Sequence, residues 1–137
     1  MKISVITPTF NSEKTIIKNV ESILTQSYKD FEHIIIDNLS SDKTLEIIRK
    51  LYIDLPSNLR IISEKDSGIS EAFNKGIKLS SGEIITILNS DDYYYSENIF
   101  EQVANVLDKS QYLISHGDVL FNDPQYGSYL RKPYRIN

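Results

Sequence analysis

The chain has 137 residues, of which 40% are hydrophobic and 25% are charged, as in an ordinary globular domain. Its formal net charge of −4 argues against a general nucleic-acid-binding protein, which needs a basic surface for phosphates. The absence of cysteine excludes disulfides, zinc–thiolate sites and thiol catalysis.

The N-terminal residues lack the apolar stretch and cleavage site of a signal peptide, and no apolar run is long enough to cross a bilayer. We therefore expect a cytoplasmic domain. Peripheral association with a membrane, at its inner face, is left open.

Short runs rich in isoleucine alternate with helical patterns along the chain. The runs predict strands at residues 3–6, 34–36, 60–62, 84–88 and 112–114. Because they are nearly continuously apolar, we expect strands buried on both faces of a parallel sheet. From residue 121 onward no period is evident, and the tail is predicted to be loop or the start of an unfinished element.

Four segments between these strands carry apolar residues at helical spacing. The first helix has Asn11 or Ser12 as its expected N-cap, Ser41 and Asp42 open the second, and the fourth starts near Ser96. The apolar positions are Ile16, Val20, Ile23 and Leu24; Leu45, Ile48, Leu51 and Tyr52; Ile69, Phe73 and Ile77; and Ile99, Val103 and Leu107.

The alternation of strands and helices predicts an α/β fold, with an open, mostly parallel sheet between helices on both faces. In such a sheet, ligands bind at the carboxyl ends of the strands. Polar clusters follow four of the expected strands, at residues 7–11, 37–38, 64–68 and 89–92. The sequence therefore predicts a site at this edge.

The cluster at residues 89–92 places Asp91 and Asp92 directly after an apolar strand. Paired carboxylates there suit a hard divalent cation, Mg²⁺ or Mn²⁺, which keeps positions open for diphosphate oxygens. The alternative is an Asx-turn followed by the N-cap of the fourth helix. The residues alone leave both interpretations open.

Asp37 and Phe10 also have two interpretations each. Asp37 either bonds a base or a ribose, or serves as a turn or capping residue. Phe10 either stacks on a base or packs against the protein. Gly68 is expected to give a tight turn or a close backbone approach to a ligand. His33 is expected to be structural, and a site role for His116 is left open.

Several enzyme classes are disfavoured by the residues that come after the first strand. No glycine-rich dinucleotide motif or phosphate-binding loop stands there, which argues against dinucleotide oxidoreductases and P-loop NTPases. The chain also has no Gly-x-Ser-x-Gly elbow of a serine hydrolase.

Taken together, the motifs resemble family 2 of the GT-A glycosyltransferases, in the right order over about the first hundred residues. They are Val5-Ile6-Thr7-Pro8-Thr9-Phe10-Asn11, Ser22-Ile23-Leu24-Thr25-Gln26-Ser27-Tyr28 with Phe31-Glu32, Ile36-Asp37-Asn38 with Ser41, Asp42 and Thr44, Glu64-Lys65-Asp66-Ser67-Gly68, Ala72-Phe73-Asn74-Lys75-Gly76-Ile77, Gly82-Glu83-Ile84 and Leu88-Asn89-Ser90-Asp91-Asp92.

The resemblance implies a Rossmann-like GT-A fold of three layers, α/β/α, and a site that binds a nucleotide-sugar, expected to be a UDP-sugar. Asp92 would be the main ligand of a Mn²⁺ or Mg²⁺ ion, and Asp91 would contact the ribose or the metal. The other nucleotide-binding residues it implies are Pro8, Thr9, Phe10, Glu13, Asp37, Asn38, Asp66, Gly68, Asn89 and Ser90.

The implied reaction is inverting transfer of a hexosyl or N-acetylhexosaminyl group to a hydroxyl of a saccharide or lipid-linked saccharide, in polysaccharide or glycoconjugate synthesis. Two departures stand out, because the family often has acids where Asn38 and Asn89 lie here. The general base is assigned to no residue, since the family supplies it from a later acceptor-binding half.

We therefore expect residues 1–137 to form one family 2 domain, apparently truncated. Residues 1–95 would be its nucleotide-sugar-binding part, and residues 96–137 the start of the acceptor-binding part. The alternative is a nucleotide-binding module without transferase activity.

Overall fold

The structure is a computed structural model that describes residues 1–108, 118–123, 125 and 127–131. The chain divides into two compact units, Met1–Ala104 and Asn105–Asn137, which are described separately. The strand predicted at residues 112–114, as well as His116, lies outside the described residues.

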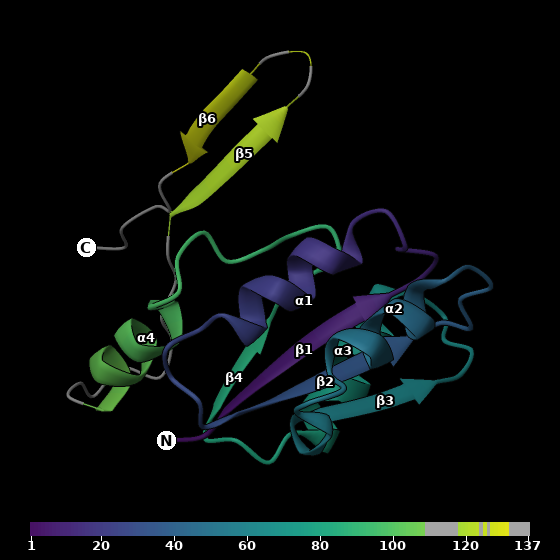
Figure 1. Cartoon of the computed structure of the whole chain (residues 1–137), viewed down its shortest axis with the longest axis horizontal. Coiled ribbons are helices and arrows are strands. Elements are labelled where there is room, and N and C mark those ends of the chain that lie inside the picture. Colours follow the sequence, from purple (N-terminus) through teal and green to yellow (C-terminus); the bar gives the residue numbers. More distant parts are fainter. Residues whose placement is uncertain (109–117, 124, 126, 132–137) are drawn as a thin grey trace. The chain divides into compact units, whose positions relative to one another are not determined.

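The first unit is built on four parallel strands in the order β3-β2-β1-β4 (Figure 1). This confirms four of the predicted strands and their parallel arrangement. The strands are β1 (Ile3–Thr9), β2 (Phe31–Asp37), β3 (Leu59–Ser63) and β4 (Ile84–Ile87). The helices are α1 (Ile16–Leu24), α2 (Thr44–Leu51), η1 (Pro56–Asn58, a 3-10 turn), α3 (Ile69–Leu79) and α4 (Ile99–Asp108).

Two hydrophobic clusters lie on opposite faces of this sheet. Ile35 of β2 packs with residues of α1 and α2, including Ile16 and Ile48. The neighbouring Ile34 and Ile36 pack on the other face, with Ala72 of α3. Successive side chains of a strand point to opposite faces, so helices cover both sides of β2. The predicted three-layer arrangement is confirmed.

Burial differs between the central and the outer strands. β1 and β2 are buried almost throughout, as predicted. β3 is at best half-buried, and in β4 Ile84 is buried whereas Ile85 and Ile87 are exposed. The expectation of burial on both faces is wrong for these two strands, because each lies at an edge of the sheet.

The buried part of the sheet contains one histidine, His33 of β2. Its ring nitrogens lie 2.7 Å from Tyr52 Oη and 2.8 Å from Thr7 Oγ1. Burial lowers the pKa of His33 to about 3, so the ring is neutral at neutral pH. The predicted structural role of His33 is confirmed by these contacts.

The N-cap of α1 differs from the residues predicted for it. Its N-cap is Thr15, rather than Asn11 or Ser12, because residues 13–15 form a turn in which Thr15 N and Ile16 N donate to Ser12 O. The Asn11 side chain instead accepts a hydrogen bond from Ser41 N. The N-cap of α2 is Lys43, and not Ser41 or Asp42 as predicted, although Asp42 accepts a hydrogen bond from Thr44 N, the first residue of the helix, at 2.9 Å.

The second unit contains an antiparallel hairpin of β5 (Val119–Asp123) and β6 (Gly127–Arg131). The rings of Phe121 and Tyr129 stack with centroids 5.1 Å apart. The prediction of loop here is wrong for these two strands. Their apolar residues are matched across the turn, and no periodicity within one segment reveals such pairing. No helix among the described residues has the length and apolar character of a membrane span.

Candidate functional site

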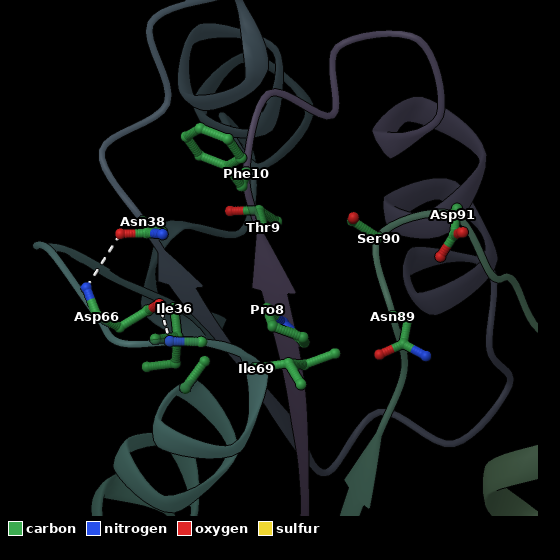
Figure 2. Close-up of a pocket in the computed structure, with 12 residues that line it drawn as sticks. Pro8, Thr9, Phe10, Ile36, Asn38, Asp66, Ile69, Asn89, Ser90 and Asp91 are labelled. Atoms are coloured by element: carbon green, nitrogen blue, oxygen red, sulfur yellow. Dashed lines mark hydrogen bonds between the residues drawn. The ribbon is translucent and has the colours of Figure 1, made fainter.

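A pocket of about 420 Å³ lies at the carboxyl ends of the strands (Figure 2). The chain runs from β1 to β2 on one side, whereas β4 pairs with β1 on the other, so the order of the sheet switches between β1 and β4. The pocket is lined by Pro8, Thr9, Phe10, Ile36, Asn38, Asp66, Gly68, Ile69, Ala72, Asn89, Ser90 and Asp91. All the predicted site residues except Glu13, Asp37 and Asp92 line it.

One side of the pocket, here called the strand side, is formed by the ends of β1 and β2 and the loop before α3. Asn38 Oδ1 accepts a hydrogen bond from Asp66 N at 3.0 Å. Because a backbone N–H can only donate, this bond fixes which way the amide lies. Figure 2 shows the Asn38 nitrogen on the side of Thr9. The side-chain nitrogen of Asn38, Nδ2, is therefore a donor that bonds no described residue.

Gly68 shapes the same side through its backbone. Its φ of 136° and ψ of 177° lie in a region that essentially only glycine adopts. Gly68 N donates to Asp66 Oδ1 at 3.0 Å, and α3 begins at the next residue. This confirms the expected tight turn. Phe10 completes the strand side and is 59% exposed at the pocket, where its ring is free to contact a ligand.

Asp37 lies beneath the strand side and is fully buried. Its carboxylate accepts hydrogen bonds from Thr9 Oγ1 at 3.0 Å, from Ser63 Oγ at 2.6 Å, and from both N and Oγ of Ser40. Asp37 thus ties together the ends of three strands and the loop after β2. Direct contact between Asp37 and a nucleoside stays a prediction.

Glu13 also lies outside the pocket lining. Its carboxylate accepts from Lys43 N, and its N–H donates to Asp42, each at 3.0 Å. These bonds connect the loops that follow β1 and β2. The predicted contact between Glu13 and a nucleotide likewise stays a prediction.

The opposite side of the pocket is the acidic turn, residues 89–92. A main-chain bond of 2.9 Å from Asp92 N to Asn89 O closes it. Asn89 Nδ2 lies 3.3 Å from Asp92 Oδ2, and Ser90 Oγ lies 2.8 Å from Ser12 Oγ in the loop after β1. This is a main-chain turn and not the Asx-turn offered as the alternative, because Asn89 Oδ1 accepts no hydrogen bond from a described residue, and α4 begins only at Ile99.

The donor set of the acidic turn fits a hard cation. Asp91 lines the pocket, and Asn89 Oδ1 is buried without a hydrogen-bond partner among the described residues. The described part of the chain holds no cluster of three His, Cys, Asp or Glu suited to a metal. Two carboxylates and an amide oxygen suit Mg²⁺ or Mn²⁺, which takes its other ligands from water and phosphates. Asp92 as main ligand stays a prediction.

Three polar residues, two in α1 and one just after its C-cap, were missing from the predicted site, and among them Asn19 bonds the acidic turn itself. Asn19, Ser22 and Gln26 all bond the chain segment that follows β4. Their spacing of three and four residues is a signal in itself, because polar residues that continue the buried face of a helix to and beyond its end need partners. The identity of those partners is visible only in the fold.

The sequence matches Glycosyl transferase family 2 over residues 4–134. It is 33% identical over 122 residues to an uncharacterized glycosyltransferase from Haemophilus influenzae, with 88% of this chain and 48% of that protein covered. It is also 33% identical over 122 residues to the poly(ribitol-phosphate) beta-N-acetylglucosaminyltransferase TarS from Staphylococcus aureus, with 88% of this chain and 20% of TarS covered.

Solved structures show the same similarity. TarS in complex with UDP-GlcNAc gives a TM-score of 0.73 at 33% identity, covering 80% of this chain and 32% of that one. The mannosyltransferase PcManGT from Pyrobaculum calidifontis, in complex with GDP-Man and Mn²⁺, gives a TM-score of 0.67 at 25% identity. The match covers 77% of this chain and 31% of that one. The chain thus spans less than half the length of each of these relatives.

Proposed function

The chain belongs to glycosyltransferase family 2 and has the GT-A fold, and we propose that it carries the donor site of an inverting transferase that uses a UDP-sugar. The observation that carries this proposal is the pocket in which three strand-end clusters and the acidic turn meet. The crystal structure of TarS with UDP-GlcNAc supports the choice of uridine, since that protein resembles 80% of this chain.

The two sides of the pocket have different roles in this proposal. Phe10, Asn38 and Asp66 on the strand side contact the nucleoside, where the Asn38 N–H suits a carbonyl oxygen of the base. Asn89, Ser90 and Asp91 face the diphosphate. Pro8, Thr9 and Gly68 complete the wall through their shape and backbone.

Asp91 and Asp92 hold the divalent metal in this proposal, with Asp91 as the ligand that faces the pocket. When bound, Mn²⁺ or Mg²⁺ neutralises the negative charge of the departing nucleoside diphosphate. The Mn²⁺ in the mannosyltransferase complex supports a metal, as does the oxygen-only chemistry of the turn.

The remaining parts of the reaction concern the acceptor. We propose a saccharide or lipid-linked saccharide hydroxyl, in polysaccharide or glycoconjugate synthesis in the cytoplasm or at the inner face of its membrane. Residues 1–95 form the nucleotide-sugar-binding part, and residues 96–137 begin the acceptor-binding part. The catalytic base is assigned to no residue of this chain.

Calorimetry with UDP in the presence and absence of Mn²⁺ tests the donor site. Wild type is expected to bind UDP with Mn²⁺, and Asp91→Asn to bind it at least about tenfold more weakly, because a metal ligand is lost. Asp54→Asn, an exposed carboxylate after α2, is the matched control and keeps wild-type affinity. No binding by wild type, or equal binding by Asp91→Asn, contradicts the proposal.

A second assay separates transfer from binding alone. Incubation with UDP-sugars and saccharide acceptors releases UDP if the chain is a transferase. Binding of UDP and Mn²⁺ without any release of UDP would support the nucleotide-binding module instead.

A further inference from the structure

Asn19 of α1 holds the acidic turn by two hydrogen bonds. The side chain is fully buried. Its Nδ2 donates to Asn89 O at 2.8 Å and to Asp92 O at 3.0 Å, which are the first and last residues of the turn. Both protons of one amide are therefore used to fix both ends of a turn that is distant in the sequence.

Two further residues, Ser22 of α1 and Gln26 just after its C-cap, bond the chain beyond the turn. Ser22 Oγ accepts from Tyr94 N at 3.0 Å. Gln26 donates to Ser96 O at 2.7 Å and accepts from Phe100 N at 3.0 Å. The segment between β4 and α4 has no regular secondary structure that would pair its backbone. The side chains of Asn19, Ser22 and Gln26 bond backbone groups of this segment instead and thereby set its path.

Asn19 differs from the other two residues because its bonds go to the turn itself. Ser90 and Asp91, between the two carbonyl groups that it holds, line the pocket. Asn19 Oδ1 has no hydrogen-bond partner among the described residues. All the hydrogen bonds that the structure gives this side chain thus go to the acidic turn.

We infer that Asn19 is a positioning residue that sets the affinity of the acidic turn for its divalent metal, without touching the metal or the nucleotide. The inference rests on the proposed metal site. A turn held at both ends presents its carboxylate with little conformational freedom to lose on binding. Loss of such outer supports typically costs about 10- to 100-fold in metal affinity.

The test compares Asn19→Leu with Gln26→Met in the full chain. Each substitution keeps a similar volume and removes a buried amide, but Gln26 lies just after α1 and bonds Ser22 O, Ser96 O and Phe100 N, none of which belongs to the acidic turn. Two quantities are measured: the Mn²⁺ affinity in the presence of UDP, and the hydrogen-exchange rate of the Asp92 amide without any ligand.

In Asn19→Leu we expect Mn²⁺ affinity to fall about 10- to 100-fold and the Asp92 amide to exchange faster. We expect both variants to have a lower Tm, with wild-type Mn²⁺ affinity in Gln26→Met. If Asn19→Leu does not fold, Asn19→Ser, which keeps one short donor, is expected to show the same loss to a smaller degree.

Two results would overturn the inference: wild-type Mn²⁺ affinity in a folded Asn19 variant, or an equal loss in Gln26→Met. Failure of the proposed function is distinguishable, because wild type itself would then bind no Mn²⁺ with UDP. If wild type binds no Mn²⁺, an Asp92 amide that exchanges at the wild-type rate in the Asn19 variant would show that Asn19 does not hold the acidic turn.

Discussion

The strand side and the acidic turn face each other across one pocket, yet the protein holds them in different ways. On the strand side, Asn38 and Asp66 bond each other at the ends of regular elements, and Asp37 ties the strand ends together from below. The acidic turn follows the edge strand β4 and depends on Asn19, 70 residues or more away in sequence. Side-chain support replaces secondary structure where the metal is proposed to bind.

Among the substitutions that test how the two sides are held, Asp37→Ala is expected to have the largest effect on stability. The change removes the acceptor for four donors of Thr9, Ser40 and Ser63. Buried donors left unpaired should lower the free energy of unfolding by about 3 kcal/mol. Urea unfolding measures the loss, with Asp54→Ala as the exposed control. A variant of wild-type stability that has lost UDP binding would instead show Asp37 to contact the nucleoside directly.

A second test uses pH, because His33 belongs to the scaffold of the strand side. The folded chain takes up its proton only near the lowered pKa of about 3, whereas the unfolded chain does so near 6.5. The stability associated with neutral His33 is therefore complete above pH 6.5 and is lost as the pH falls below it. The slope is up to about 1.4 kcal/mol per pH unit.

Unfolding measured between pH 7.5 and 5 checks this slope, with His33→Gln as the comparison. In His33→Gln, the free energy of unfolding is expected to change less with pH over this range, even if it is lower than that of wild type at pH 7.5. Parallel profiles for the two proteins would contradict the assignment of the slope to His33.

The smallest effect is expected for Gly68→Ala on the strand side. A Cβ at this position would meet no atom within 4 Å, so the cost comes from the backbone conformation alone. At a φ of 136° it should be about 1–2 kcal/mol of stability. Ser70→Ala, at the second residue of α3, is the matched control for chemical denaturation. Unchanged stability in Gly68→Ala would mean that the loop relaxes without strain.

The meeting of the polar clusters was predictable, because the carboxyl ends of parallel strands share one edge of a sheet. The direction of each side chain was not. Asp37 and Asn38 are neighbours in sequence, yet Asp37 is buried beneath the strands and Asn38 lines the pocket. Likewise, Asp91 lines the pocket and Asp92 does not. These directions depend on how each strand or turn leaves the sheet.

The role of Asn19 was even harder to predict from the sequence. An asparagine on the buried face of a helix predicts that it has a partner, but that partner is a pair of backbone carbonyl groups. A backbone carbonyl has the same chemistry at every residue, so sequence offers no complementary residue type to find. The hairpin of β5 and β6 was missed for a related reason, since its pairing joins residues across a turn.

The central claim is that one pocket binds the nucleoside on its strand side and a metal–diphosphate at its acidic turn. The most direct measurement is an amide NMR titration with UDP and Mg²⁺, followed by replacement of Mg²⁺ with paramagnetic Mn²⁺. We predict shifts at residues 9, 10, 38 and 66–69, and Mn²⁺ broadening centred on residues 89–92. Broadening centred elsewhere, or no shifts on the strand side, would contradict the account.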